Sequence, residues 1–367
     1  MESAASPNTI LWLAFALGGV FGAVGNRTHF CTMGAVSDIV NMGEWSRMRM
    51  WLLAIAVAVL GSAALHASGQ IDLGKSIYRT PNFIWLSYLV GGLCFGVGMV
   101  LASGCGGKTL IRIGGGNVKS LVVFLVLGIV AYMTMRGVLG VFRVNVLERV
   151  SIYLPGGQDL PALLSAYGMA PDSALAVCAL AIAGALLAVV FARRDFLTFD
   201  NLLGGIVTGL VVVGGWYVSG HLGYLAEDPD TLQEAFIATN SGRMESFTFV
   251  APQAYTLELL MLWSDSSRKM SFAIAGALGV VAGSMLYALL SRSFRWEGFR
   301  DVEDTANHLL GAALMGFGGV VATGCTIGQG ITGLSTLAAG SLLAFAAFIA
   351  GAAAALKYQY WKLLRAT

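Results

Sequence analysis

Eight long runs without a charged residue dominate this chain of 367 residues. A helix that crosses a bilayer needs about 20 consecutive, mainly apolar residues, so such runs mark candidate membrane spans. Charged residues make up only 11% of the chain, whereas a soluble domain carries about 25%. This composition excludes a water-soluble enzyme, a nucleic-acid-binding protein and a disordered protein. The charge-free runs cover residues 3–26, 50–71, 80–107, 120–135, 173–192, 201–226, 270–291 and 305–356.

The last of these runs, residues 305–356, is too long for one span and has room for two spans and a short apolar loop. Backbone groups inside a bilayer must be hydrogen-bonded within the protein, which favours helices. The sequence therefore predicts an all-α polytopic membrane protein with about nine transmembrane helices. We expect the helices near residues 10–25, 50–66, 82–102, 118–138, 173–192, 202–218, 270–290, 307–323 and 339–357.

Lysine and arginine are unevenly distributed between the two sides that nine crossings define. The loops on the side of Met1 carry 8 of the 22 basic residues, and the loops on the other side carry 14. Cytoplasmic loops of membrane proteins hold an excess of basic residues. We therefore expect the N-terminus outside the cell and the C-terminus in the cytoplasm.

Two stretches of the chain resemble each other. Residues 93–105 and 314–325 are both rich in glycine, and both end a predicted span with Ala-(Ser/Thr)-Gly-Cys. If the match is not chance similarity among Gly/Ala/Val-rich helices, helices 1–4 repeat as helices 6–9, five crossings later. An odd number of crossings inverts the second half, which gives an inverted-topology repeat of the kind found in secondary transporters. The expected organisation is a first repeat at 1–140, a linker with helix 5 at 141–200, and a second repeat at 201–367.

The Gly-Cys sequences predict re-entrant loops. Glycine permits a sharp turn, and irregular backbone at membrane depth is tolerated only inside protein or beside a cavity. A short helix that begins after Gly104-Cys105 or Gly324-Cys325 would direct its free N–H groups and the positive end of its dipole inward, which suits an anion. Cys31 also lies next to a turn rich in small residues, and it is a third candidate.

Further polar residues near these loops are candidates for a substrate path. Thr326 and Gln329 are uncharged residues able to donate hydrogen bonds. Arg27 and Lys108 either attract an anion on the cytoplasmic side or only satisfy the basic bias of cytoplasmic loops. Cys94 and Cys178 lie in apolar helix and are expected to be small buried core residues. No CxxC pair, metal-ligand spacing or nucleotide-binding loop is present, so neither a metal nor a cofactor is predicted.

Three sequence blocks resemble the YeeE/YedE family of bacterial inner-membrane proteins. They read Arg27-x-x-Phe30-Cys31-x-x-Gly34-Ala35-x-x-Asp38, Phe95-Gly96-x-Gly98-Met99-Val100-Leu101-Ala102-x-Gly104-Cys105, and Leu314-Met315-Gly316-Phe317-Gly318-Gly319-x-x-Ala322-x-Gly324-Cys325-Thr326-Ile327-Gly328-Gln329-Gly330. The resemblance implies an hourglass-shaped fold of nine helices, with pathway cysteines that map onto Cys31, Cys105 and Cys325. It also implies uptake of a sulfur compound, thiosulfate in the best-known branch, or of a selenium species in the YedE branch.

The chemistry of the thiol agrees with this expectation. Thiosulfate is a dianion with a soft terminal sulfur, and a neutral thiol is a weak donor with a soft, polarizable sulfur. Several weak sites in series allow an ion to enter and to leave, as conduction requires. A thiolate would repel the dianion, so we expect protonated cysteines.

Two other classes of function remain open from the sequence. One is a membrane thiol oxidoreductase or sulfurtransferase that uses these cysteines covalently, although no general base or cofactor motif accompanies them. The other is a docking protein for a cytosolic sulfur carrier of the TusA type, with residues 292–304 and their three arginines as the candidate surface.

Overall fold

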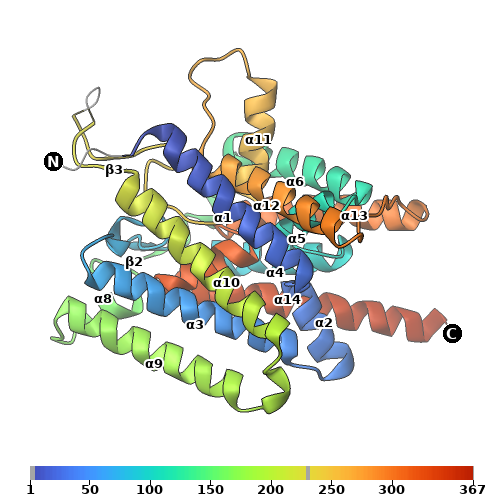
Figure 1. Ribbon diagram of the computed structural model, residues 1–367, viewed down its shortest axis with the longest axis horizontal. Coiled ribbons are helices and arrows are strands. Elements are labelled where there is room, and N and C mark those ends of the chain that lie inside the picture. Colours follow the sequence, from blue (N-terminus) through green and yellow to red (C-terminus); the bar gives the residue numbers. More distant parts are fainter. Residues whose placement is uncertain (1–4, 229–231, 367) are drawn as a thin grey trace.

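The computed structural model describes residues 5–228 and 232–366, and most of this part of the chain is helical (Figure 1). Two antiparallel pairs of two-residue strands join loops: β1 (Asn82–Phe83) with β2 (Ile152–Tyr153), and β3 (Tyr224–Leu225) with β4 (Ala235–Phe236). The α-helices are α1 (Pro7–Arg27), α2 (Thr32–Met42), α3 (Ser46–Ala67), α4 (Trp85–Leu101), α5 (Gly106–Gly114), α6 (Val118–Arg136), α7 (Val138–Phe142), α8 (Leu160–Ser165), α9 (Pro171–Phe191), α10 (Phe199–Tyr217), α11 (Ala251–Met261), α12 (Phe272–Leu290), α13 (Val302–Val321) and α14 (Ala339–Ala366). Short 3₁₀ or π turns occur at η1 (Leu73–Lys75), η2 (Arg143–Leu147), η3 (Arg194–Phe196), η4 (Val218–Leu222) and η5 (Gly328–Gly333).

Within the described residues, eight helical segments are long and apolar enough to cross a membrane. They contain α1, α3, α4, α6, α9, α10, α12 and α14. The remaining predicted span, residues 307–323, coincides with α13, a helix of 20 residues whose first turn carries Glu303 and Asp304. The expectation of an all-α polytopic membrane protein is confirmed.

Two short helices, α2 and α11, were not expected from the sequence. Each has 11 residues, about half the length of a span, so a search for long apolar runs passes over both. α2 begins at Cys31, whose sulfur accepts the Gly34 N–H, and it ends at Gly43 in the left-handed conformation that favours glycine. α11 begins with a proline at its first turn, where a missing N–H has no cost.

The long helices pack in matching pairs. α1 packs on α12, and α3 packs on α10; α4 packs on α14, and α6 packs on α13. The pairs α1 with α10 and α4 with α13 are also in contact. Helices 1–4 of the sequence prediction are α1, α3, α4 and α6, and helices 6–9 are α10, α12, α13 and α14. Exchanging the two sets in order converts the first four contacts into one another in pairs and leaves the last two unchanged.

Glycine lets the antiparallel helices α4 and α13 touch backbone to backbone. A Cβ placed on Gly98 would lie 2.7 Å from the Gly311 carbonyl oxygen, and one on Gly311 would lie 2.6 Å from the Gly98 oxygen. The same relation holds between Gly91 and Gly318, at 2.8 and 2.5 Å. Small residues allow such close approach between helices in membranes. This contact explains part of the glycine content, which is 48 residues.

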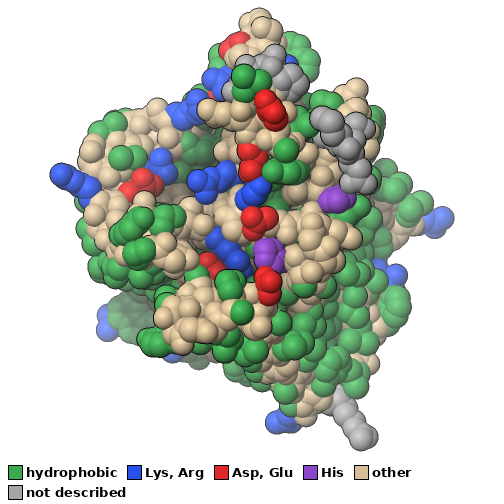
Figure 2. Space-filling model, turned by 90° about the vertical axis from the view of Figure 1, so that its left-hand side faces the viewer, with side chains coloured by type: hydrophobic (Ala, Val, Ile, Leu, Met, Phe, Trp, Pro, Cys, Tyr) green, Lys and Arg blue, Asp and Glu red, His purple; other side chains and the backbone are tan. Residues whose placement is uncertain are grey.

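The molecule has two unlike ends (Figure 1). The start of α1, the strand pairs and the start of α9 lie at one end, while α2 and the last turns of α14 lie at the other. Figure 2 shows the first of these ends face-on, with charged side chains and histidines gathered near its centre and apolar side chains around them. The segments before α4 and before α11 are in contact, and Ser76 and Met244 form a buried bridge between them.

We expect substitution of Gly311 by alanine to destabilise the protein, because the new methyl group would overlap the backbone of α4. Overpacking of this kind costs about 1–3 kcal/mol. The control is Gly184→Ala in α9, where a Cβ would meet nothing within 4 Å. Thermal unfolding in detergent should show a lower Tm for Gly311→Ala and an unchanged or higher Tm for Gly184→Ala; equal values would contradict the close contact.

Candidate functional site

Two loops of the same geometry end α4 and α13. Ser103 and Thr323 both adopt a left-handed conformation with a φ of 56°. In the first loop the Gly104 N–H donates to the Met99 oxygen at 2.8 Å, and in the second the Gly324 N–H donates to the Gly319 oxygen at 2.8 Å. These bonds satisfy carbonyl groups at the end of each helix and turn the chain sharply. The similarity seen in the sequence is therefore also a similarity of backbone conformation.

Each loop leads through its cysteine into a short buried helix. Cys105 precedes α5, and Cys325 precedes the helical residues 326–335, which contain the π turn η5. The expected short helix after each cysteine is present in the structure. Both cysteines are buried, with exposed fractions of 3% and 0%.

Hydrogen-bond donors surround the Cys325 sulfur. It accepts the Phe249 N–H at 3.2 Å and the Gly328 N–H at 3.4 Å, and the Thr248 hydroxyl lies at 3.7 Å. Two of these donors come from residues 244–250, an extended and largely buried segment between the loop strands and α11. Backbone N–H groups that converge on one point form an environment for electron-rich ligands.

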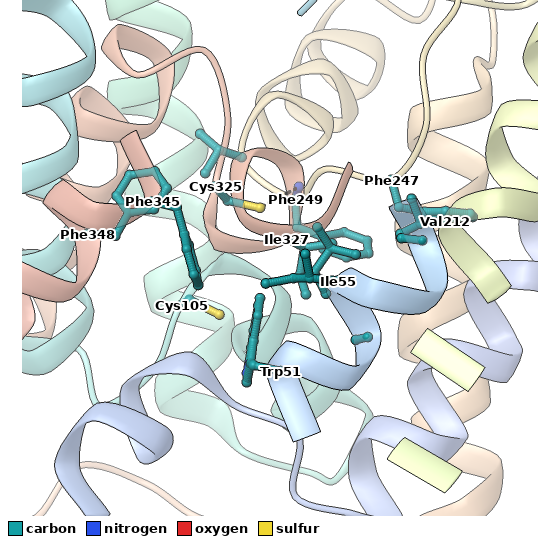
Figure 3. Packing of buried hydrophobic residues seen from close by; sticks show 14 of the residues in the cluster. Trp51, Ile55, Cys105, Val212, Phe247, Phe249, Cys325, Ile327, Phe345 and Phe348 are labelled. Atoms are coloured by element: carbon teal, nitrogen blue, oxygen red, sulfur yellow. Dashed lines mark hydrogen bonds between the residues drawn. The ribbon is translucent and has the colours of Figure 1, made fainter. Parts of the chain in front are cut away.

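The three candidate cysteines lie together. The Cys105 thiol has Cys31, Cys325 and the Thr326 hydroxyl as electrostatic neighbours. Cys31 is 7% exposed and stands at the start of α2. Figure 3 shows Cys105 and Cys325 within the same group of buried side chains. The structure thus brings into one region three residues that are 74 and 220 positions apart in the chain, by their numbers.

Aromatic and aliphatic side chains enclose this group of thiols (Figure 3). The Trp51 ring stacks on Phe30 with centroids 4.7 Å apart and on Phe345 with centroids 5.8 Å apart. Phe21 and Phe249 stack at 5.4 Å. Such an enclosure excludes water, so polar groups inside it act at a low effective dielectric constant.

Gln253 of α11 connects the two cysteine regions. Its side-chain amide donates to the Phe249 oxygen at 2.7 Å and to the Gly106 oxygen at 3.2 Å. Phe249 in turn donates to Cys325, and Gly106 follows Cys105. This fully buried glutamine therefore fixes the spacing of both loops. The sequence analysis missed this glutamine because the residues of α11 fall in the loop between the predicted spans 202–218 and 270–290.

The expected neighbours Thr326 and Gln329 are fully buried. The Gln329 amide donates to the Ala322 oxygen at 2.5 Å and to the Thr323 hydroxyl at 2.7 Å, which braces the second loop. The Thr326 hydroxyl faces the Cys105 thiol, and within the described residues it makes no hydrogen bond of good geometry. Unpartnered buried polar atoms are uncommon and call for an explanation.

A side chain at Gly104 or Gly324 would be in tight contact with the helix that follows. A Cβ on Gly104 would lie 3.2 Å from the Lys108 Cβ, and one on Gly324 would lie 3.2 Å from the Gln329 Cγ. Both approaches are tighter than ordinary van der Waals contact. The loops can therefore fold back onto the helices that follow them.

The two expected basic residues have different positions. Lys108 has Cys31, Cys105, Arg47 and Arg112 as electrostatic neighbours, and it belongs to the group around the thiols. Arg27 is exposed and forms an ion pair with Asp200 at 2.9 Å. Arg27 is thus held at the surface by α10.

The other two cysteines are separate from this group. Cys94 lies half-buried in α4, and Cys178 lies in α9, where Asp159 and Arg79 are its charged neighbours. Within the part of the chain that the structure describes, no group of three His, Cys, Asp or Glu side chains could hold a metal ion.

Comparison with known proteins gives consistent results. The chain is 27% identical over 329 residues to the "Thiosulfate transporter TsuA" of Escherichia coli (strain K12), covering 86% of this chain and 84% of that protein. It is 25% identical over 373 residues to the "Thiosulfate transporter TsuA" of Spirochaeta thermophila, covering 93% and 97%. A family model described as "Sulphur transport" matches residues 27–354, nearly the whole chain. Together with the paired loops and the helical membrane fold, this match shows that the chain belongs to the Sulphur transport family.

Proposed function

We propose that this protein imports a small sulfur-containing anion, thiosulfate in the first place, along a path lined by Cys31, Cys105 and Cys325. The observation that carries the proposal is the gathering of three buried thiols by two loops of matching geometry. The names of the two relatives support thiosulfate as the substrate. A selenium analogue of the anion has the same kind of soft atom and is the alternative cargo.

The surroundings of the thiols suit both ends of thiosulfate. A neutral thiol can donate weakly to the soft terminal sulfur and release it again. The sulfonate oxygens are harder acceptors and prefer O–H and N–H donors. The Thr326 hydroxyl lies next to the Cys105 thiol, where it can serve these oxygens. The N–H groups of Phe249 and Gly328 are directed at the Cys325 sulfur instead and hold it in place.

We further propose that residues 1–140 and 201–367 are inverted repeats, joined by a linker and helix at 141–200. The paired helix contacts and the shared loop conformation support this division. The chain then lies in the bacterial inner membrane, with the α9 start outside and α2 in the cytoplasm, because the basic loops lie at the α2 end. The terminal residues Met1 and Thr367, which defined the two sides in the sequence, lie outside the described residues.

The loop between α12 and α13 offers a surface for a cytosolic sulfur carrier of the TusA type. Arg292, Arg295 and Arg300 are exposed, and the Trp296 side chain between them is 80% exposed. Arginine and tryptophan are enriched at protein interfaces. A carrier bound here would stand beside the α4–α13 pair. Membership in a transport family argues against the enzyme alternative.

Replacement of the pathway cysteines tests the proposed function. Cys105→Ala and Cys325→Ala should each nearly abolish thiosulfate uptake at normal expression, because an enclosed anion would lose its partner and no water can replace it. Serine at either position should restore little of the uptake, because its hydroxyl is a shorter and harder donor than the thiol. Cys31→Ala should reduce uptake. The measurement is uptake of labelled thiosulfate by cells that have no other uptake system.

Cys94→Ala and Cys178→Ala are the matched controls, because both cysteines lie outside the group around the path. Their small loss of volume should cost about 1 kcal/mol of stability and leave uptake near the wild-type level. Wild-type uptake by the Cys105→Ala, Cys325→Ala double variant would refute the thiol path.

Reporter fusions test the proposed orientation. A reporter that works only in the cytoplasm should be active when it is inserted in the 292–304 loop. A reporter that works only outside the cytoplasm should be active when it is inserted near residue 168, before α9. The physical reason is the excess of lysine and arginine at the α2 end. The reverse pattern at both positions would show that the orientation is wrong.

The carrier surface is tested separately. Trp296→Ala combined with Arg295→Ala should weaken binding of a purified TusA-like carrier to the detergent-solubilised protein, while proteoliposomes of the variant still take up thiosulfate. Removing a central tryptophan and an arginine from an interface typically costs about 2 kcal/mol or more. If the variant binds the carrier as strongly as the wild type does, the 292–304 loop is not the binding surface.

A further inference from the structure

A buried carboxyl group lies on the segment that touches Cys325. Residues 244–250 follow β4 and lead to the Cys325 sulfur and the start of α11. Glu245 stands near the start of this segment and is 8% exposed. Four residues further on, Phe249 donates its N–H to Cys325 at 3.2 Å. A buried acid beside the path of an anion is unexpected, because like charges repel strongly in such surroundings.

Glu245 lacks the cationic partner that neighbouring acids have. Its carboxylate accepts the Ser241 hydroxyl at 3.1 Å and the Asn240 N–H at 3.4 Å. Among the described residues no Lys, Arg or His nitrogen lies within 4.0 Å of it. On the same side of the molecule, Glu234 pairs with Lys75 at 2.6 Å and Glu258 pairs with Arg268 at 3.1 Å.

Two tyrosines are the titratable groups that face Glu245 from neighbouring elements. Tyr78, before α4, has both Glu245 and Cys325 as electrostatic neighbours, and Tyr255 comes from α11. The Tyr78 hydroxyl oxygen would lie 3.4 Å from a Cβ on Gly328, the residue whose N–H donates to Cys325. From η4, the Ser219 hydroxyl donates to the Glu245 backbone carbonyl. The Tyr78 phenol is thus a neighbour of both the carboxyl group and the thiol.

Burial raises the pKa of Glu245 to about 7, although the hydrogen bonds from Ser241 and Asn240 act in the opposite direction. The group therefore changes charge within the physiological range, where an unperturbed glutamate is fully ionised. Below this pKa the carboxyl is neutral, and above it a negative charge stands next to the route to Cys325.

We propose that Glu245 is a proton-binding site coupled to anion binding: the dianion reaches Cys325 when the Glu245 carboxyl is protonated. This inference rests on the proposed function, since it requires an anion at Cys325. Coupling between two ligands is reciprocal, so anion binding must also draw a proton onto Glu245. Such a coupling requires a carboxyl group that can gain and lose its proton near neutral pH. A salt bridge would keep the carboxyl ionised at every relevant pH, so the absence of a cation in this buried site favours the coupling.

The test is thiosulfate uptake by proteoliposomes at a clamped membrane potential, from about pH 5.5 to about pH 8.5. Thiosulfate itself stays a dianion over this range. The wild-type KM should be flat below about pH 7 and rise by up to about tenfold per pH unit above it, because only the protonated fraction binds the anion. In Glu245→Gln, which imitates the protonated acid, the KM should not depend on pH.

Glu234→Gln is the matched control, because Glu234 lies on the same loop but is paired with Lys75. It should keep the wild-type pH profile. In parallel, addition of thiosulfate to lightly buffered wild-type protein in detergent at about pH 7.5 should remove protons from solution. This second measurement needs no variant and therefore does not depend on the folding of Glu245→Gln.

The outcomes separate the two proposals. Wild-type protein that takes up no thiosulfate contradicts the proposed function. Uptake with a pH-independent KM and no proton release or binding overturns the role of Glu245 and leaves the function intact. A pH profile that is the same in Glu245→Gln as in the wild type also overturns it, because another group would then be the one that titrates.

Discussion

The close backbone contact between α4 and α13 determines where the functional loops can lie. A Cβ on Gly311 would lie 2.6 Å from the Ala102 nitrogen, at the point where the Cys105 loop begins. A Cβ on Gly91 would lie 2.6 Å from the Ala322 nitrogen, where the Cys325 loop begins. Each helix therefore supports the loop of the other. With larger residues at these glycines the helices would separate, and the loops would lose their supports.

Irregular backbone inside a membrane protein needs internal partners for its polar groups. The Schellman-type bonds at Ser103 and Thr323 supply some of them, and buried side chains supply the others. Gln253 binds two carbonyl groups near the thiols, and Gln329 binds a third at Ala322. These fixed groups hold the thiols in place, while within the described residues the Thr326 hydroxyl makes no hydrogen bond of good geometry. The proposed path thus has a rigid frame and few strong contacts for its cargo, which agrees with brief binding.

Much of the fold could be predicted from the sequence because its signals are local. A run such as 173–192 must span a membrane wherever it lies, and a Gly-Cys pair after a span favours a turn in any context. The helices α2 and α11 could not be found in this way, since 11 residues carry no spanning signal. Their positions depend on packing: α2 packs on α3 and α14, and α11 packs on α6 and α12. The sequence therefore leaves the residues of both helices in loops between predicted spans.

The sequence by itself determined that this is a helical membrane protein, that two similar Gly-Cys loops exist, and that Cys105 and Cys325 are unlike Cys94 and Cys178. These conclusions need only hydropathy, spacing and repetition, which are properties of short segments. Tertiary structure alone decided that Phe249 donates to Cys325, that Gln253 joins both loops, that Arg27 is held by Asp200, and that Glu245 is buried without a cation. The reason is that hydrogen bonding and desolvation depend on which distant segments meet, and for Glu245 these segments are α11, η4 and the residues before α4.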